Sequence, residues 1–238
     1  MKLDILAFGA HPDDIELSCG GTILKHIRLG KKAGLVDLTR GELGTRGTPD
    51  LRDAEAKEAA SILGVSAREN LNFADGFFQN DHLHQLKVIS AIRKYQPEII
   101  LCNAVTDRHP DHGKAARLVA DAAFYAGLIK IETTLDGKKQ DPWRTKAIYH
   151  YIQDRYIRPH FVTDITEFME KKMEAVKAFR SQFYDPSSSE PVTPISSKEF
   201  LEFTYSRAMD MGRPINVKYA EGFTVERITA VHSLFDLH

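Results

Sequence analysis

A short cluster of histidine and aspartate near the N-terminus has the composition of a metal site. Its sequence is His11-Pro12-Asp13-Asp14. His11 and Asp14 are three residues apart, so both can reach one metal ion from a turn between a strand and a helix. Asp13 lies between them and must point elsewhere, which leaves its carboxylate free to act as a base. A simpler alternative is that Asp13 or Asp14 only caps the N-terminus of the following helix.

A second cluster, His109-Pro110-Asp111-His112, repeats this composition far along the chain. Like the first cluster, it follows an apolar run and precedes a helical pattern. Ligands bind beyond the carboxyl ends of parallel strands, so two neighbouring strands would bring both clusters to one crevice. His11, Asp14 and His112 then supply two imidazoles and one carboxylate, with positions left open for water and substrate. Open positions are typical of catalytic metal sites, whereas structural sites are closed by four protein ligands.

Short apolar runs and helical spacing alternate through the first half of the chain and predict the elements that position both clusters. Strands are expected at 3–9, 33–39, 70–73 and 99–102, with helices between and after them. Such alternation favours a parallel sheet with right-handed crossovers. The sequence therefore predicts an α/β fold with a Rossmann-like, doubly wound, mainly parallel sheet. The site is expected at the carboxyl ends of the first and fourth strands.

The second half of the chain is less regular. Further elements are expected as strands at 147–152, 161–163 and 219–225 and as a helix at 168–179. Ser196 and Glu199 have the spacing of a capping box, so another helix is expected to begin there and run to about Met211. Because no repeat or linker divides the chain, residues 1–238 are expected to form a single domain.

The composition is that of an ordinary soluble globular protein, with 42% hydrophobic and 27% charged residues. Thirty-two basic residues nearly balance thirty-three acidic ones, so we expect neither nucleic acid nor a membrane as a partner. Two cysteines, Cys19 and Cys102, are too few for a disulfide framework. No run approaches the ~18 apolar residues of a membrane helix, and the N-terminal run is too short and polar for a signal segment. These features predict a cytoplasmic protein.

Several segments together resemble a known family. The motifs Ala-His-Pro-Asp-Asp-x-Glu at 10–16 and His-Pro-Asp-His at 109–112 resemble those of the PIG-L (LmbE-like) zinc-dependent N-acetylglucosaminyl deacetylases. Gly41-Glu42, Arg52-x-x-Glu55 and Tyr219–Phe223 extend the resemblance over nearly the whole chain. Within the family, the Thr106-Asp107-Arg108 segment and the late segment resemble the bacillithiol-biosynthesis deacetylases, which act on N-acetylglucosaminyl malate.

The resemblance implies a metal centre. His11, Asp14 and His112 would hold Zn2+, and these ligand types also permit Fe2+. The ion would lower the pKa of a bound water toward ~7 and would polarise the acetamide carbonyl.

The resemblance also implies how protons would move. Asp13 would take the proton of the water and later pass it to the leaving amine. His109 would face the oxyanion or donate a proton, and Asp111 would fix the orientation of His109.

Three residues are expected to contact the substrate. Arg52 and Arg108 resemble family positions in the substrate pocket, and guanidinium groups suit the two carboxylates of a malate group. A surface ion pair is the alternative for either arginine. Asp75 resembles a position that accepts hydrogen bonds from sugar hydroxyls, and the loop Gly41–Gly47 is a candidate lid. The resemblance further suggests a homo-oligomer, a trimer or a hexamer.

Other functions are disfavoured or stay open. A dinucleotide-binding oxidoreductase is disfavoured because Gly9-Ala10-His11 stands where the G-x-G-x-x-G fingerprint would be. A non-haem iron oxygenase could use the same two histidines and one carboxylate, but the additional Asp13 and His109 favour hydrolysis. A deacetylase of another N-acetyl sugar, such as diacetylchitobiose, and a non-catalytic metal-binding or sugar-binding protein remain alternatives.

Overall fold

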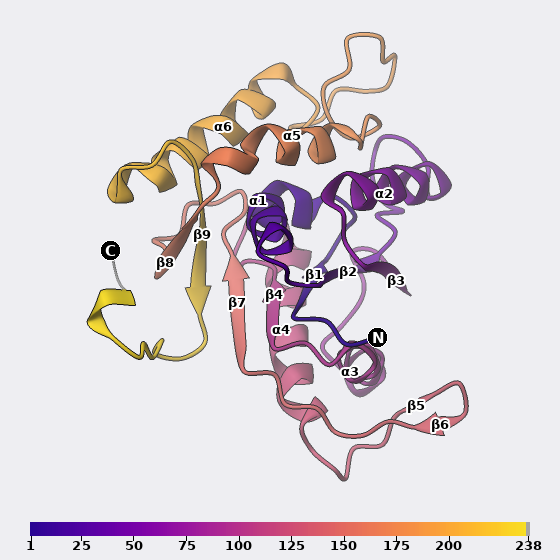
Figure 1. Cartoon of the computed structure of the whole chain (residues 1–238). Coiled ribbons are helices and arrows are strands. Elements are labelled where there is room, and N and C mark those ends of the chain that lie inside the picture. Colours follow the sequence, from indigo (N-terminus) through magenta and orange to yellow (C-terminus); the bar gives the residue numbers. More distant parts are fainter. Residues whose placement is uncertain (237–238) are drawn as a thin grey trace.

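Seven strands form one sheet at the centre of the computed structural model, which describes residues 1–236 (Figure 1). The strands are β1 (Ile5–Gly9), β2 (Ala33–Thr39), β3 (Ala67–Phe73), β4 (Ile99–Cys102), β7 (Ala147–Tyr151), β8 (Phe161–Asp164) and β9 (Ala220–Val225). Their order is β3-β2-β1-β4-β7-β9-β8. Neighbours from β3 to β7 are parallel, and β9 is antiparallel to both β7 and β8. The order runs outward in both directions from β1 and β4, which confirms the predicted doubly wound, mainly parallel sheet.

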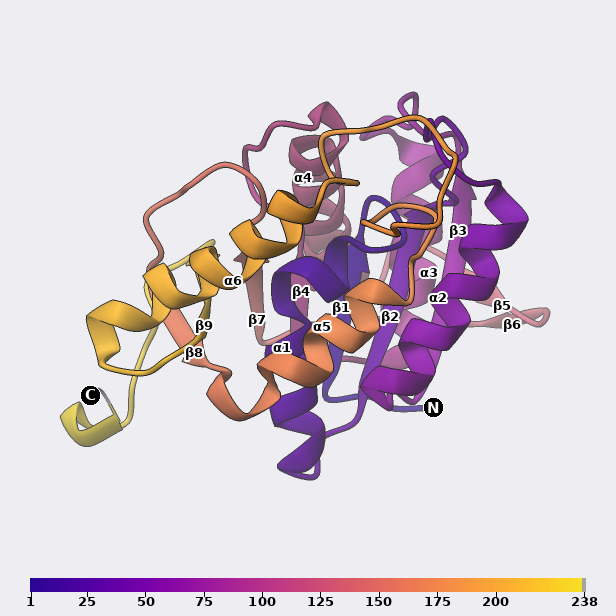
Figure 2. The same ribbon diagram turned by 90° about the horizontal axis from the view of Figure 1, so that it is seen from above.

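Helices cover both faces of the sheet (Figure 2). One face carries α1 (Asp14–Arg28), α2 (Pro49–Leu63) and α5 (Met169–Lys177) with α6 (Lys198–Gly212) beside them, and the other carries α3 (His82–Tyr95) and α4 (Pro110–Ala126). In β1, Ile5 and Ala7 pack with the first group of helices, whereas Leu6 and Phe8 pack with α3 and α4. A parallel strand that is covered on both faces needs a continuous apolar sequence, and β1 has one.

The remaining elements are short. They are the hairpin β5 (Thr134–Leu135) and β6 (Lys138–Lys139) and the 3-10 helices η1 (Thr166–Phe168), η2 (Arg213–Ile215) and η3 (Leu234–Asp236). Cys19 and Cys102 are both buried free thiols. Between residues 1 and 236, no helix combines the length and the apolar sequence that crossing a membrane requires. Residues 237–238 of the predicted domain lie outside the described residues.

The strand β3 begins earlier than its apolar pattern predicts. The first half of β3 is stabilised mainly by buried ion pairs of Arg68 and less by apolar packing. Arg68 forms ion pairs with Glu16 at 2.5 Å and with Asp37 at 2.7 Å, and all three side chains are buried. A search for apolar alternation therefore finds only the later residues of this strand.

The predicted capping box of α6 is wrong by one residue. Ser197 caps the helix, because its hydroxyl accepts a hydrogen bond from the Phe200 backbone N–H at 3.2 Å. The Ser196 hydroxyl instead accepts from the Thr193 backbone N–H at 2.8 Å. Two adjacent serines offer two possible starts, and the turn at 193–196 decides between them.

Candidate functional site

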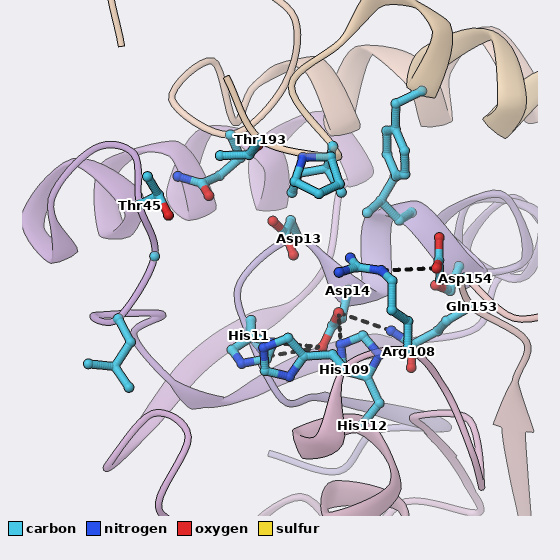
Figure 3. Close-up of a pocket in the computed structure, with 18 of the residues that line it drawn as sticks. His11, Asp13, Asp14, Thr45, Arg108, His109, His112, Gln153, Asp154 and Thr193 are labelled. Carbon is cyan, nitrogen blue, oxygen red and sulfur yellow. Dashed lines mark hydrogen bonds and ion pairs between the residues drawn. The ribbon is translucent and has the colours of Figure 1, made fainter. Parts of the chain in front are cut away.

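The two histidine clusters meet at the carboxyl ends of β1 and β4, which are paired neighbours in the sheet (Figure 3). One carboxylate lies between the two imidazoles. Asp14 Oδ1 lies 3.1 Å from His112 Nε2, and Asp14 Oδ2 lies 3.7 Å from His11 Nδ1. All three residues are buried. The fold therefore brings together the three residues that the sequence predicts as metal ligands.

The imidazoles of His11 and His112 each have one nitrogen near Asp14 and an outer nitrogen, on the opposite side of the ring, that contacts another carboxylate. His112 Nδ1 lies 2.5 Å from Asp107 Oδ2. His11 Nε2 lies 3.0 Å from Asp75 Oδ1 and 3.5 Å from Asp111 Oδ2. Metal-binding histidines typically have this arrangement, in which an outer carboxylate sets the tautomer and aims the other nitrogen at the ion. Two imidazoles and one carboxylate, each oriented in this way, are donor types that suit a divalent metal.

The electrostatics of the cluster also favour a bound cation. Burial opposes the charged form of His11, but its bonds to Asp111 and Asp75 outweigh burial and raise the pKa of His11 to about 10. Burial opposes the charged form of His112 as well, yet Asp14 and Asp107 raise its pKa to about 9. The carboxylates thus supply more negative charge than neutral imidazoles can balance. Either protons on the imidazoles or a bound metal ion would balance this negative charge.

Two sets of potential ligand atoms lie within 4.8 Å of one another in the described chain, His11 with His109 and His112, and His11 with Asp75 and Asp111. The second set uses the outer nitrogen of His11. It already has a cation beside it, because Lys114 Nζ lies 2.6 Å from Asp111 Oδ1. The first set faces the pocket, so a metal ion fits better on the side of His112.

Asp13 occupies the N-cap position of α1, but its side chain does not cap the helix. Its backbone has φ 115° and ψ −27°, a region that residues with a side chain rarely adopt. Such conformations cost on the order of 1–3 kcal/mol and persist where the surroundings enforce them. The simple capping alternative for Asp13 is therefore excluded. Its carboxylate lines the pocket beside the proposed metal ligands (Figure 3).

Arg52 is the partner of Asp13. Its Nη2 donates to Asp13 Oδ2 at 3.0 Å and to the Pro12 carbonyl at 2.9 Å, and its Nη1 donates to the Gly41 carbonyl at 3.1 Å. Burial raises the pKa of Asp13 to about 7, although the charge of Arg52 lowers it. Both terminal nitrogens of Arg52 thus contact protein oxygens. Arg52 also lines the pocket, and its expected contact with a substrate carboxylate stays a prediction.

Gly41 makes room for this arginine. Its φ is +66°, and a Cβ at this position would lie 1.7 Å from Arg52 Nη1. No side chain fits there unless the guanidinium moves away from Asp13. The absence of a side chain at Gly41, in the candidate lid, therefore leaves the space that the guanidinium of Arg52 occupies beside Asp13.

His109 is the N-cap of α4. Its Nδ1 accepts a hydrogen bond from the Asp111 backbone N–H at 3.2 Å, so in the neutral ring Nε2 carries the proton. Burial, followed by the charges of His11 and His112, lowers the pKa of His109. A neutral ring that lines the pocket with an N–H can donate to a substrate oxygen.

Asp111 orients His109 through its backbone and not through its carboxylate. The carboxylate accepts from the Gly76 backbone N–H at 2.8 Å and contacts His11 and Lys114. The expected link between Asp111 and His109 therefore exists, but the atom that makes it differs from the side-chain group that we expected.

Asp75 is engaged by protein donors on both of its oxygens. Oδ1 contacts His11 Nε2 at 3.0 Å, and Oδ2 accepts from the Leu43 backbone N–H at 3.0 Å. These contacts support a proposed metal ligand and the loop Gly41–Gly47. Asp75 also lines the pocket, and its expected contact with sugar hydroxyls stays a prediction. Leu43, Gly44 and Thr45 of that loop line the pocket. Closure of the loop as a lid stays a prediction.

Arg108 lines the pocket together with Arg52 and Arg207. Its Nε donates to Asp154 Oδ2 at 3.0 Å, and its guanidinium extends over Asp14 and His112 (Figure 3). Among residues 1–236, no hydrogen bond or ion pair engages its terminal nitrogens. The pocket has a volume of about 320 Å³, which suits a small sugar derivative.

Three supporting residues were missed by sequence reasoning. Asn103 Nδ2 donates to Asp14 Oδ2 at 2.9 Å, and Gln153 Nε2 donates to Asp14 Oδ1 at 3.0 Å. Asp107 holds His112. Asn103 and Asp107 follow β4, so their position after a buried strand was an available signal. Gln153 follows β7, and nothing near it in sequence points to the site.

Comparisons with known proteins decide the family. A profile of the PIG-L family, described as GlcNAc-PI de-N-acetylase, matches residues 6–123. A diacetylchitobiose deacetylase of Thermococcus kodakarensis is 31% identical over 189 residues, which cover 75% of this chain and 70% of that protein. The chain belongs to the PIG-L family. This membership confirms the family that the two motifs predict.

Relatives of this PIG-L protein have more than one activity. A probable N-acetyl-alpha-D-glucosaminyl L-malate deacetylase 2 of Bacillus anthracis is 26% identical over 75% of this chain and 81% of its own length. A 4-oxalmesaconate hydratase of Pseudomonas putida is 28% identical over 74% of this chain and 73% of its own. The crystal structure of the conserved protein TT1542 from Thermus thermophilus superposes with a TM-score of 0.84 and 35% identity, covering 97% of this chain and 98% of that one. Membership in the family therefore does not by itself fix the reaction.

Proposed function

We propose that this PIG-L protein hydrolyses the acetamide of an N-acetylglucosaminyl compound and releases acetate and a free amine. The observation that carries the proposal is the pairing of two carboxylate-held imidazoles, both facing Asp14, with a separate buried carboxylate, Asp13, on the adjacent residue. A binding protein would need the first feature but has no use for the second. The deacetylases among the relatives support the same reaction.

His11, Asp14 and His112 are the proposed ligands, with Zn2+ as the expected ion and Fe2+ as the alternative. When bound, a divalent metal supplies Lewis-acid polarisation and lowers the pKa of water. Asn103 and Gln153 orient the Asp14 carboxylate, and Asp107 orients the His112 ring. These contacts orient Asp14 and His112, and Asp75 orients the His11 ring in the same way.

Asp13 and His109 perform the proton transfers in this proposal. As water attacks the acetyl carbon, Asp13 takes one of its protons. The Nε2–H of His109 donates to the carbonyl oxygen while negative charge develops there. The carbon–nitrogen bond then breaks, and the proton on Asp13 passes to the leaving amine. The balance is one amide and one water consumed for one acetate and one amine.

Arg108 supports the malate conjugate as the substrate. Its terminal nitrogens face the pocket, and a guanidinium binds a carboxylate with two parallel hydrogen bonds. Diacetylchitobiose is the alternative, and its uncharged second sugar would lie against the apolar wall of Leu17, Ile195 and Phe200.

Amine release tests the reaction and the substrate together. N-acetylglucosaminyl malate, diacetylchitobiose and free N-acetylglucosamine are compared with and without chelator. We expect chelator-sensitive release that favours the malate conjugate. Preference for diacetylchitobiose would retain the reaction and reject Arg108 as a carboxylate partner. If metal is bound but no amine forms, the deacetylase proposal fails, and hydration of an unsaturated acid becomes the next assay.

We further propose that the protein is cytoplasmic and forms a homo-oligomer, either a trimer or a hexamer. The C-terminal segment supports association, because Ile228 and Phe235 are each 95% exposed and Leu234 is 81% exposed. Exposed apolar side chains of this size often mark a protein contact. Light scattering on the purified protein gives the mass directly, and a monomer at micromolar concentration would reject the oligomer.

A further inference from the structure

The turn after β7, residues 153–155, is placed against the metal side of the pocket. We call it the β7 turn. Gln153 Nε2 donates to Asp14 Oδ1 at 3.0 Å, as Figure 3 shows. Gln153 Oε1 also accepts from Asn103 Nδ2 at 3.0 Å, and Asn103 holds the other oxygen of Asp14. The position of the turn therefore sets the position of one proposed metal ligand.

The same turn reaches the second ligand and the substrate arginine. The backbone N–H of Arg155 donates to Asp107 Oδ1 at 2.7 Å, and Asp107 Oδ2 contacts His112. Asp154 Oδ2 accepts from Arg108 Nε at 3.0 Å. Three consecutive residues thus contact both sides of the proposed reaction centre, although none of the three belongs to a strand or a helix.

Arg207 on α6 holds this turn by its backbone. Its Nη1 donates to the Gln153 carbonyl, and its Nη2 donates to the Asp154 carbonyl at 2.9 Å. A guanidinium is a rigid planar fork, so two bonds to successive carbonyls fix both the position and the tilt of the peptide between them. Lysine has one flexible ammonium group and cannot impose the same geometry.

We propose that Arg207 is a positioning residue for this site. It holds the β7 turn so that Gln153 orients Asp14, Asp107 orients His112 and Asp154 extends Arg108 across the pocket. The proposal rests on the proposed function for the identity of the site. Its first consequence is for metal affinity, which is measured without any substrate.

Competition with a chromogenic chelator for Zn2+ tests the metal side. Loss of outer contacts typically weakens metal binding by about 10–100-fold. We expect Arg207→Met to weaken Zn2+ binding by about tenfold and Arg207→Lys to recover part of that loss. Arg213→Met is the matched control, because Arg213 is an exposed arginine directly after α6, and it should bind Zn2+ as the wild type does. Equal Zn2+ affinity in the wild type and Arg207→Met would overturn the proposal.

A double-mutant cycle tests the substrate side and separates positioning from general damage. Arg207→Met should raise KM for N-acetylglucosaminyl malate in the wild type but not in an Arg108→Met background, because it acts on KM through Arg108. Equal increases in both backgrounds would reject that route. If the methionine variant does not fold, Arg207→Lys carries both tests. If the wild type binds Zn2+ but hydrolyses no substrate, the proposed function fails while the affinity measurement still decides the role of Arg207.

Discussion

The two histidines of the proposed metal centre face the same carboxylate but are supported in different ways. His11 has two carboxylates near its outer nitrogen, Asp75 at 3.0 Å and Asp111 at 3.5 Å. His112 has one, Asp107 at 2.5 Å. If one carboxylate near His11 is removed, the other still contacts its ring, whereas His112 has only the Asp107 contact at its outer nitrogen within residues 1–236. The difference shows that symmetric motifs in sequence need not give a symmetric site.

Removing the single partner of His112 should have the larger effect on metal binding. We expect Asp107→Asn to weaken Zn2+ affinity by about 100-fold, because among residues 1–236 Asp107 is the only charged group that contacts Nδ1 of His112. Chelator competition at constant pH measures this effect. An affinity within about threefold of the wild type would show that the His112 side has support that the contacts do not reveal.

Removing one of the two partners of His11 should have a smaller effect. Asp75→Asn is expected to weaken Zn2+ binding by about tenfold, since Asp111 remains beside the same nitrogen. The double variant Asp75→Asn with Asp111→Asn should then approach the loss seen in Asp107→Asn. If the second substitution adds nothing, Asp111 does not act as a reserve partner and the comparison fails.

The His11 side also contains the base and its arginine, which gives a prediction for pH dependence. Arg52 lowers the pKa of Asp13, so Arg52→Met should raise that pKa. If Asp13 is the base, as proposed, it acts in its deprotonated form, so the acidic limb of kcat/KM should move to higher pH, by about one unit. Arg40→Met is the control, because Arg40 pairs with Asp50 and Asp53 away from the base. An unchanged acidic limb in Arg52→Met would show that Arg52 does not set the pKa of the base.

The inner residues of the site were accessible to sequence reasoning because their chemistry is local. His11, Asp13 and Asp14 form one turn after a strand, and the alternation of strands and helices predicts a doubly wound parallel sheet in which the first and fourth strands can be neighbours. Once two such turns follow neighbouring strands, their side chains are expected to meet in one site, and no other part of the chain is needed to predict this.

The outer residues depend on which segments the fold brings together. Gln153 and Arg207 reach the site from the β7 turn and from α6, and no motif in the sequence around them resembles the two histidine clusters. The contacts of Arg52 and Asp75 also required coordinates. Their residue types suit a substrate carboxylate and sugar hydroxyls, and the structure adds contacts with Asp13 and with the Leu43 backbone that no sequence pattern indicated. Sequence indicates what a side chain can bind, whereas packing decides what it does bind.

The most direct test of the account separates the adjacent aspartates. Zn2+ content and amine release are measured together in Asp13→Asn and Asp14→Asn. We expect Asp13→Asn to keep wild-type Zn2+ content and to lose turnover by about 1,000-fold, as removal of a general base does. Asp14→Asn should lose the metal as well as the activity. Loss of metal in Asp13→Asn, or amine release near the wild-type rate in that variant, would contradict the assignment of base and ligand.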